Sequence, residues 1–294
     1  MNLHLLRTFA SVVEQGGFTR AAKAIHVSQP AVSRAVRELE EQLGIALLER
    51  AGGTLRCTEA GTALYRHAKG IFAHEQAAES DLRGLRGLEA GNLVVGAGHS
   101  IATYILPKLI ARFLERFADI DVRIVSDNTI AIEEKLLACE IDVALIEAPT
   151  HDPRIELLNW REDEMVILAS AKHLFTARDP IDPAQLGTMR WIMREAGSGT
   201  REVAQSLLHD IGIEVHRILE VSSNGAVVQF VAAGLGVTMI SLEVARDQIG
   251  LGRVMTVAIE GFRPRRKLYR ARLRDRPMSP AAHAFDAIAA GEGL

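Results

Sequence analysis

The feature that most constrains this chain is a break between two helical patterns in residues 18–48, FTRAAKAIHVSQPAVSRAVRELEEQLGIALL. Apolar residues recur at helical spacing on both sides of the break: Phe18, Ala21, Ala22 and Ile25 before it, then Val32, Val36, Leu39 and Leu43 after it. Residues 26–28 interrupt that spacing. The pattern predicts two short helices that are joined by a tight turn and that each bury one face.

The second of these helices carries a polar face opposite its apolar stripe. Ser28 is a good N-cap and Pro30 suits a first helical turn, so we expect the helix to begin at about Gln29. The polar face would present Gln29, Ser33, Arg34 and Arg37. Such side chains can hydrogen-bond base edges in the major groove and bind phosphates. The pattern predicts a helix-turn-helix, although a packed helical hairpin with a solvated polar face has the same spacing.

Length and charge limit the possible functions. A chain of 294 residues with 48% hydrophobic content has room for a small domain and a larger one. Its net charge of −3 argues against a protein that coats nucleic acid through bulk charge. Residues 1–58 nevertheless hold seven Lys or Arg against five Glu. DNA affinity would therefore come from local placement of cations and from doubling the site by dimerisation.

Other features exclude several classes of protein. Cys57 and Cys139 are the only cysteines, and neither they nor the histidines show metal-ligand spacing, so we expect no metal, no cofactor and no disulfide. No signal segment opens the chain, and no run of about 18 apolar residues occurs in it. We expect a cytoplasmic protein with no membrane partner.

Residues 59–88 form a long stretch without Pro. Its apolar residues fall close to a heptad stripe: Leu64, Ala68, Ile71, Ala78, Leu82 and Leu85. A helix of this length would measure about 45 Å, too long to bury one face against a domain of 58 residues. The stretch predicts a linker helix through which two copies pair, and a core helix of one domain is the alternative.

From residue 91 onward, short apolar strands alternate with helical segments. Strands are expected at 92–96, 122–125, 141–146, 165–169, 191–193, 220–222, 237–241 and 267–273, and helices at 104–117, 130–138, 200–208, 225–233 and 280–290. This alternation predicts an α/β domain with a mostly parallel sheet. The last strand and helix are expected to return to the first half, which gives two lobes joined by crossings near 149–162 and 261–266. A ligand would bind between the lobes.

Four loops contain groups that could hold a small anion. Residues 96–103 and 195–201 combine glycines with hydroxyl side chains before a helix, and residues 127–129 and 222–224 add hydroxyl and amide groups before two more. For any single loop, ordinary helix capping is the alternative. Two enzyme motifs are incomplete in these loops. Gly96-x-Gly98 lacks the third glycine of a dinucleotide-binding fingerprint. The glycines around Ser198 do not have the spacing of the nucleophile elbow of hydrolases.

The N-terminal pattern is similar to a known family. The segments Ala21-Ala22, Ser28-Gln29-Pro30-Ala31-Val32-Ser33, Leu39-Glu40, Leu43-Gly44 and Thr58-x-Ala60-Gly61 resemble the DNA-binding domain of LysR-type transcriptional regulators. The resemblance implies a winged helix-turn-helix with its wing at residues 50–58. The candidate DNA contacts are Thr19, Arg20, Ser28, Gln29, Pro30, Ser33, Arg34, Arg37, Arg50 and Arg56. The chain departs from the family at Gly53, where an Arg for the minor groove is usual, and at Cys57, where an aliphatic residue is usual.

The rest of the chain resembles the effector domain of the same family, which has a two-lobed, periplasmic-binding-protein-like fold. Its motifs look like those of regulators of sulfur assimilation and carbon fixation: Asn128-Thr129, Ile146-Glu147, Arg194-Glu195-x-Gly197-Ser198-Gly199-Thr200-Arg201 and Ala233-Gly234-Leu235-Gly236. The candidate effector contacts are Ser100, Ala102, Thr103, Thr129, Ser198, Gly199, Thr200 and Asn224. In this family the linker helix is a coiled coil that pairs two DNA-binding heads.

Together these patterns predict a ligand-responsive regulator that binds promoter DNA as a homodimer or homotetramer and responds to a small anion. We expect a DNA-binding domain at 1–58, a linker helix at 59–90 and an effector domain at 91–294. Lobe I of that domain would comprise 91–160 and 266–294, and lobe II would comprise 161–265. A two-lobed solute-binding protein is the alternative, and an α/β enzyme is third. Eight cations within residues 263–276 are expected to form a solvated strand face, with an oligomer or DNA contact as the alternative.

Overall fold

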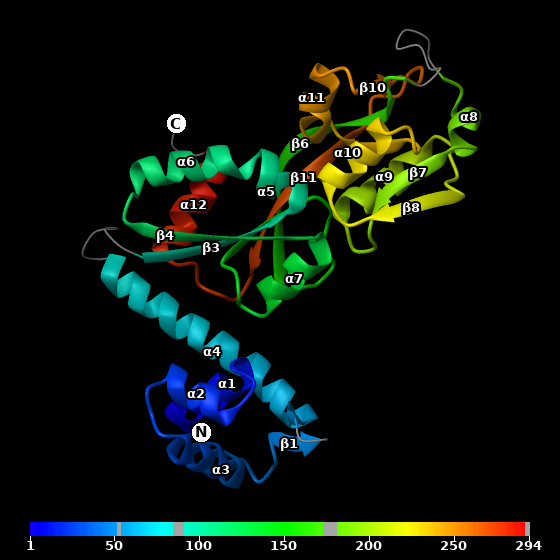
Figure 1. Cartoon of the computed structure of the whole chain (residues 1–294). Helices are drawn as coiled ribbons and strands as arrows, with labels where there is room; N and C mark the ends of the chain where they lie inside the picture. Colours follow the sequence, from blue (N-terminus) through cyan, green and yellow to red (C-terminus); the bar gives the residue numbers. More distant parts are fainter. Residues whose placement is uncertain (52–53, 85–90, 173–180, 292–294) are drawn as a thin grey trace. The chain divides into compact units, whose positions relative to one another are not determined.

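The computed structural model describes residues 1–51, 54–84, 91–172 and 181–291, which form two compact units, Met1–Glu79 and Ser80–Leu294. The first unit is helical with one small hairpin (Figure 1). Its elements are α1 (Leu3–Glu14), α2 (Phe18–Ala24), α3 (Gln29–Leu43), β1 (Leu48–Ala51), β2 (Thr54–Cys57) and α4 (Glu59–Gly84), which continues into the second unit. The apolar faces of α1, α2 and α3 form its core.

The turn between α2 and α3 follows the sequence-based prediction. His26 adopts a left-handed backbone conformation with φ of 56°, which turns the chain. The Ser28 hydroxyl accepts a hydrogen bond from the Ala31 amide at 3.3 Å, so α3 begins at Gln29 as predicted. The prediction was wrong for one residue of the apolar stripe, Leu43. Leu43 is 39% exposed because the last turn of α3 extends beyond the core.

The stripe on α4 divides between two environments. Ala68 is buried in the core of the first unit, and Leu64 and Ile71 pack against that core. Ala78 and Leu82 are exposed, and Leu85 lies outside the described residues. The prediction of one continuous stripe for pairing two copies was therefore wrong for its first half, since that half stabilises the chain's own head.

The second unit contains two α/β lobes. In lobe I, β3 (Gly91–Gly98) pairs in parallel with β4 (Ile120–Asp127) and β5 (Val143–Ile146). Helices α5 (His99–Tyr104), α6 (Leu106–Arg116) and α12 (Pro280–Ala290) cover one face of this sheet, and α7 (Thr129–Leu137) covers the other (Figure 1). The helix predicted over 104–117 is α6, which begins two residues later than predicted, with Pro107 in its first turn. The short helix α5 before it was not predicted.

Lobe II is built on four strands with helices on both sides. The strands β7 (Arg190–Arg194) and β8 (Arg217–Val221) pair in parallel, and Trp191 of β7 forms a bridge with Val237, just before β9 (Thr238–Ser241). Both β9 and β10 (Val254–Val257) pair antiparallel with the long strand β6 (Ile155–Ser170). Helices α8 (Pro183–Gly187) and α9 (Gly199–Asp210) pack on one face, and α10 (Asn224–Ala232) and α11 (Leu242–Gly250) pack on the other. The sequence patterns missed α8, α11 and β10, which are short.

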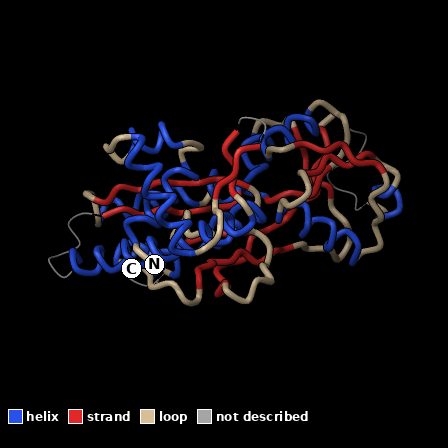
Figure 2. Tube along the Cα trace, turned by 90° about the horizontal axis from the view of Figure 1, so that it is seen from below, coloured by secondary structure: helices blue, strands red, loops and turns tan. Residues whose placement is uncertain are grey.

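Two long antiparallel strands connect the lobes. They are β6 (Ile155–Ser170) and β11 (Arg265–Leu273), paired from Arg265 opposite Glu164 to Leu273 opposite Ile155. Figure 2 distinguishes the strands of this unit, in red, from its helices, in blue. The first crossing was predicted as a link and is largely strand, because β6 pairs with β11 over that length. These antiparallel strands also make the sheet less parallel than expected. The predicted return of β11 and α12 to lobe I is confirmed.

Candidate functional site

The basic residues on the polar face of α3 do not bind other described residues of the protein. Val32, Val36 and Leu39 point into the core, whereas Gln29, Arg34 and Arg37 are exposed and Ser33 is half-buried. Among the described residues, Arg34 and Arg37 form no hydrogen bond or ion pair. The first nine residues of α3 also contain no carboxylate. These side chains are available to a ligand that carries negative charge.

Other predicted DNA contacts surround this face on α2 and the hairpin. Thr19 and Arg20 are exposed on α2, and Nη2 of Arg20 donates to the Gly16 carbonyl at 2.8 Å. Pro30 is exposed, and the Ser28 hydroxyl is used as the N-cap of α3. Arg56 is exposed on β2. The side chain of Arg50, as well as Gly53, lies outside the part of the chain that the structure describes.

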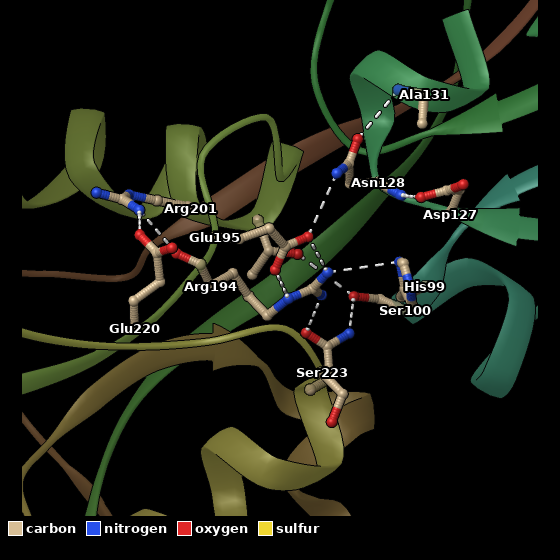
Figure 3. A network of polar contacts seen from close by, with 12 residues as sticks. His99, Ser100, Asp127, Asn128, Ala131, Arg194, Glu195, Arg201, Glu220 and Ser223 are labelled. Atoms are coloured by element: carbon tan, nitrogen blue, oxygen red, sulfur yellow. Dashed lines mark hydrogen bonds and ion pairs between the residues drawn. The ribbon is translucent and has the colours of Figure 1, made fainter. Parts of the chain in front are cut away.

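In the second unit, Arg194 at the end of β7 lies at the centre of a buried polar network (Figure 3). Its Nε and Nη2 each donate to a carboxylate oxygen of Glu195 at 2.8 Å. Its Nη1 donates to Oδ1 of Asn224, on α10, at 2.7 Å. Its Nη2 also lies 3.4 Å from Nδ1 of His99, on α5 in lobe I. Arg194 therefore connects the two lobes.

The network continues through hydroxyl groups. Nδ2 of Asn224 donates to the Ser100 hydroxyl at 2.9 Å, and that hydroxyl lies 3.4 Å from the hydroxyl of Thr200. Thr200 also accepts from Nη1 of Arg266, on β11, at 2.9 Å. Nε of Arg266 donates to Asp163, on β6, at 2.8 Å. A continuous chain of polar contacts thus runs from lobe I to both connecting strands.

The carboxylate of Glu195 remains ionised in this setting. Burial alone would raise its pKa, but hydrogen bonds from Arg194, with a further contribution from Asn128, hold the pKa below its ordinary value. Nδ2 of Asn128, at the start of α7, approaches Glu195 at 3.5 Å. The Arg194–Glu195 pair is consequently an internal ion pair with no net charge.

Three helices begin at this network. Asn128 and Ser223 cap α7 and α10 by accepting from Ala131 and Ala226, but the Ser198 side chain makes no capping hydrogen bond to α9. Two buried side-chain atoms in the same region also have no hydrogen-bond partner in the part of the chain that the structure describes: the hydroxyl of Thr129 and Nη2 of Arg266. Because unpaired buried polar atoms are rare, these atoms indicate where a ligand could bind.

The structure brings together most of the predicted effector residues. Buried residues at the starts of α5, α7, α9 and α10 account for six of them: Ser100, Thr129, Ser198, Gly199, Thr200 and Asn224. Ala102 instead packs against the core of lobe I, and Thr103 is exposed. Sequence reasoning missed His99, Asp163, Arg194, Glu195 and Arg266 as site residues. Arg194 and Glu195 were noticed only as a motif, and Arg266 only as part of the basic run.

Among the described residues, no group of three or more His, Cys, Asp or Glu side chains is arranged to hold a metal ion. None of the described helices has the length and apolarity required to cross a bilayer.

Comparison with known proteins covers nearly the whole chain. Residues 3–62 match the family described as bacterial regulatory helix-turn-helix protein, lysR family, and residues 86–292 match the LysR substrate binding domain. The RuBisCO operon transcriptional regulator of Allochromatium vinosum is 32% identical over 97% of this chain and 94% of its own length. The HTH-type transcriptional regulator CysL of Bacillus subtilis is 32% identical over 91% of this chain and 90% of its own length.

Solved structures share the fold. Full-length CbnR in complex with its target DNA is 25% identical, with a TM-score of 0.70 over 100% of both chains. The regulatory domain of CcmR from Synechocystis, in complex with 2-PG, is 25% identical, with a TM-score of 0.63 over 68% of this chain and 96% of its own.

Proposed function

This chain belongs to the LysR family of transcriptional regulators, and from that premise we propose which of its parts bind DNA and which bind the effector. It is a DNA-binding regulator, not an enzyme, and it is similar to regulators of carbon fixation. We assign DNA binding to residues 1–58, pairing of two copies to 59–90 and effector binding to 91–294, with lobes at 91–160 plus 266–294 and at 161–265. Because its target is promoter DNA, we place the protein in the cytoplasm.

The observation that carries the DNA-binding assignment is the exposed, unpaired basic face of α3. Arg34 and Arg37 would bind phosphates, while Gln29 and Ser33 would contact base edges. Thr19, Arg20, Ser28, Pro30, Arg50 and Arg56 would flank them on α2, α3 and the wing. The target-DNA complex of CbnR, which shares the fold over its full length, supports this assignment.

We assign effector binding to the buried helix starts between the lobes. Ser100, Thr129, Ser198, Gly199, Thr200 and Asn224 would contact a small anion there, with Ala102 and Thr103 following on α5. The complex of the CcmR regulatory domain with 2-PG supports an anionic ligand. A ligand that binds one arrangement of the lobes better than another would shift the populations of the two arrangements, and with them the way paired heads bind DNA.

Substitution of Arg34 tests the DNA-binding assignment. Arg34→Ala removes one phosphate contact from each head, so we expect weaker binding to promoter DNA and a slope of log affinity against log salt that is shallower by about 0.9 for each bound head. The slope is measured by fluorescence anisotropy with a labelled promoter fragment at several salt concentrations.

Arg253→Ala is the matched control, since it removes an exposed Arg in the second unit and changes net charge equally. It should leave both affinity and slope unchanged. If Arg34→Ala also leaves the slope unchanged, Arg34 does not contact phosphate. If the wild-type chain binds no DNA sequence specifically, the proposed function is wrong.

A further inference from the structure

Two buried arginines, Arg194 and Arg266, lie at the interlobe site. They differ in whether every guanidinium nitrogen has a hydrogen-bond partner. Every nitrogen of the Arg194 guanidinium has a partner: Glu195, Asn224 or His99. In Arg266, Nε donates to Asp163 and Nη1 donates to Thr200, whereas Nη2 has no partner among the described residues. Arg266 is only 3% exposed, so water contributes little to satisfying this donor.

A second buried polar atom without a described hydrogen-bond partner lies against the first turn of α9. A Cβ placed on Gly199 would come within 2.5 Å of the Thr129 hydroxyl oxygen, so this hydroxyl faces the first residue of α9 directly. The Thr129 hydroxyl is buried and, like Nη2 of Arg266, has no hydrogen-bond partner among the described residues. The next residue, Thr200, is the one that Arg266 contacts. Thr129 and Arg266, which carry these two unpaired atoms, therefore lie against consecutive residues of α9, Gly199 and Thr200.

The start of α9 supplies additional donors. This helix has 12 residues, and its N-cap Ser198 makes no side-chain hydrogen bond to the first amides. Open amides at a helix start attract an oxyanion. They matter here because the ion pairs Arg194–Glu195 and Arg266–Asp163 are neutral and Glu147 is also buried, 3.1 Å from the Ser100 amide. The site therefore attracts an anion through directed donors, not through excess positive charge.

We propose that Arg266, supplied by the connecting strand β11, is the cation that binds the effector's oxyanion, a carboxylate, phosphate or sulfate group. The Thr129 hydroxyl donates a second hydrogen bond to the same group. Arg194 is a positioning residue whose charge Glu195 neutralises. This inference rests on the proposed function, because it names the residue that selects the ligand's acid group at the effector site.

The test uses the full-length protein and thermal unfolding at constant ionic strength. The probes are 2-PG, shikimate and inorganic sulfate, with chloride as the reference anion. Arg266→Gln combined with Asp163→Asn removes the guanidinium and keeps the buried charges balanced. Arg265→Gln combined with Glu162→Gln is the matched control, since it removes the neighbouring ion pair between the same two strands. DNA binding and the Tm without probe show whether each variant is folded.

We expect at least one oxyanion to raise the Tm of the wild type and of the Arg265/Glu162 variant with similar midpoint concentrations. The Arg266/Asp163 variant should need at least about tenfold more of it, because a charge-assisted hydrogen bond is lost. A wild-type response in the Arg266/Asp163 variant would overturn the proposal, as would a loss confined to the Arg265/Glu162 variant. Absence of any response in a wild type that still binds DNA would overturn it too, and would leave the regulator assignment intact.

Thr129→Val gives an independent measurement that does not depend on a buried ion pair. Its hydroxyl has no hydrogen-bond partner among the described residues, so the variant should fold normally and bind the oxyanion about three to tenfold more weakly. Unchanged affinity in this variant would remove Thr129 from the subsite and overturn the proposal in its stated form.

Discussion

At the scale of single residues, the motifs of the first unit fix the entry and exit of the wing. The Glu40 carboxylate accepts from the amides of Leu47 and Leu48 at 2.7 and 3.1 Å. The Thr58 hydroxyl accepts from the Gly61 amide at 3.0 Å and donates to the Ala46 carbonyl at 2.8 Å. These contacts connect the end of α3 and the start of α4 to the same short segment, which explains the spacing in Leu39-Glu40 and Thr58-x-Ala60-Gly61.

Gly61 tests this packing. A Cβ at Gly61 would lie 2.0 Å from the Leu47 carbonyl oxygen, so Gly61→Ala must displace the backbone before the wing. We expect it to lower the free energy of unfolding of the first unit by about 1–3 kcal/mol, the usual cost of overpacking. Urea unfolding followed by circular dichroism measures the change.

Gly70→Ala is the control in the same helix, because nothing lies within 4 Å of its added Cβ. It should leave stability unchanged or raise it by up to about 1 kcal/mol. Equal effects of the two substitutions would show that the close approach to Leu47 is unimportant.

At the scale of elements, the basic run of β11 is explained by its partner strand. Arg265, Arg266 and Arg272 form ion pairs with Glu162, Asp163 and Glu156 on β6, while Arg270 and Arg276 pair with Asp286 and Asp142. The expectation of a merely solvated strand face was wrong, because the antiparallel register sets acidic residues opposite these cations. The two strands that connect the lobes are thereby held together by charge as well as by backbone hydrogen bonds.

The pair formed by Glu156 and Arg272 predicts a pH dependence. The hydrogen bond from Arg272 lowers the pKa of Glu156 below 4.5. A carboxyl whose pKa is lowered by folding adds stability above its unfolded pKa and loses it as the pH falls through the folded pKa. Glu156→Gln should therefore cost about 0.5 kcal/mol at pH 7, a value set by the partial exposure of the pair.

This cost should shrink as the pH falls below about 4.5, the ordinary pKa of the carboxyl. Urea unfolding at pH 7 and pH 3.5 measures it, with the exposed Glu115→Gln as the control. A cost that stays constant across this range would exclude the ion pair as its source.

At the scale of the whole molecule, α4 belongs to both units. The division falls between Glu79 and Ser80, inside the helix. Its first half contributes Ala68 to the core of the head, while Leu82 in the second half is 67% exposed. An apolar side chain left exposed on a helix between two units is a natural contact for a second copy, and paired heads are needed to bind two half-sites.

Leu82→Glu tests that role. A charge in the helix pairing surface should raise the dissociation constant of the dimer at least tenfold and weaken binding to a two-site promoter fragment more than to a single half-site. Sedimentation velocity and anisotropy measure the two effects. Leu251→Glu, at a site that is 63% exposed in lobe II, is the control and should change neither. If both variants remain fully dimeric, α4 does not pair the copies through Leu82.

The sequence by itself determined the features that depend on near neighbours along the chain. The periodicity of Val32, Val36 and Leu39, together with Ser28 and Pro30, was sufficient to predict where α3 begins and which face it buries. The helix starts at Thr129, Gly199 and Asn224 were likewise predicted to within one residue, because glycines and capping side chains act over a few positions.

Only the tertiary structure decided which distant groups meet. Arg266 bonds Thr200 across 66 positions and Asp163 across 103, and Arg194 reaches Asn224 across 30. The length of β6 and the burial of half of the α4 stripe also depend on residues that are distant in the sequence. Strand register and the packing of helices on sheets fix these pairs, and neither leaves a periodic signal in the local sequence.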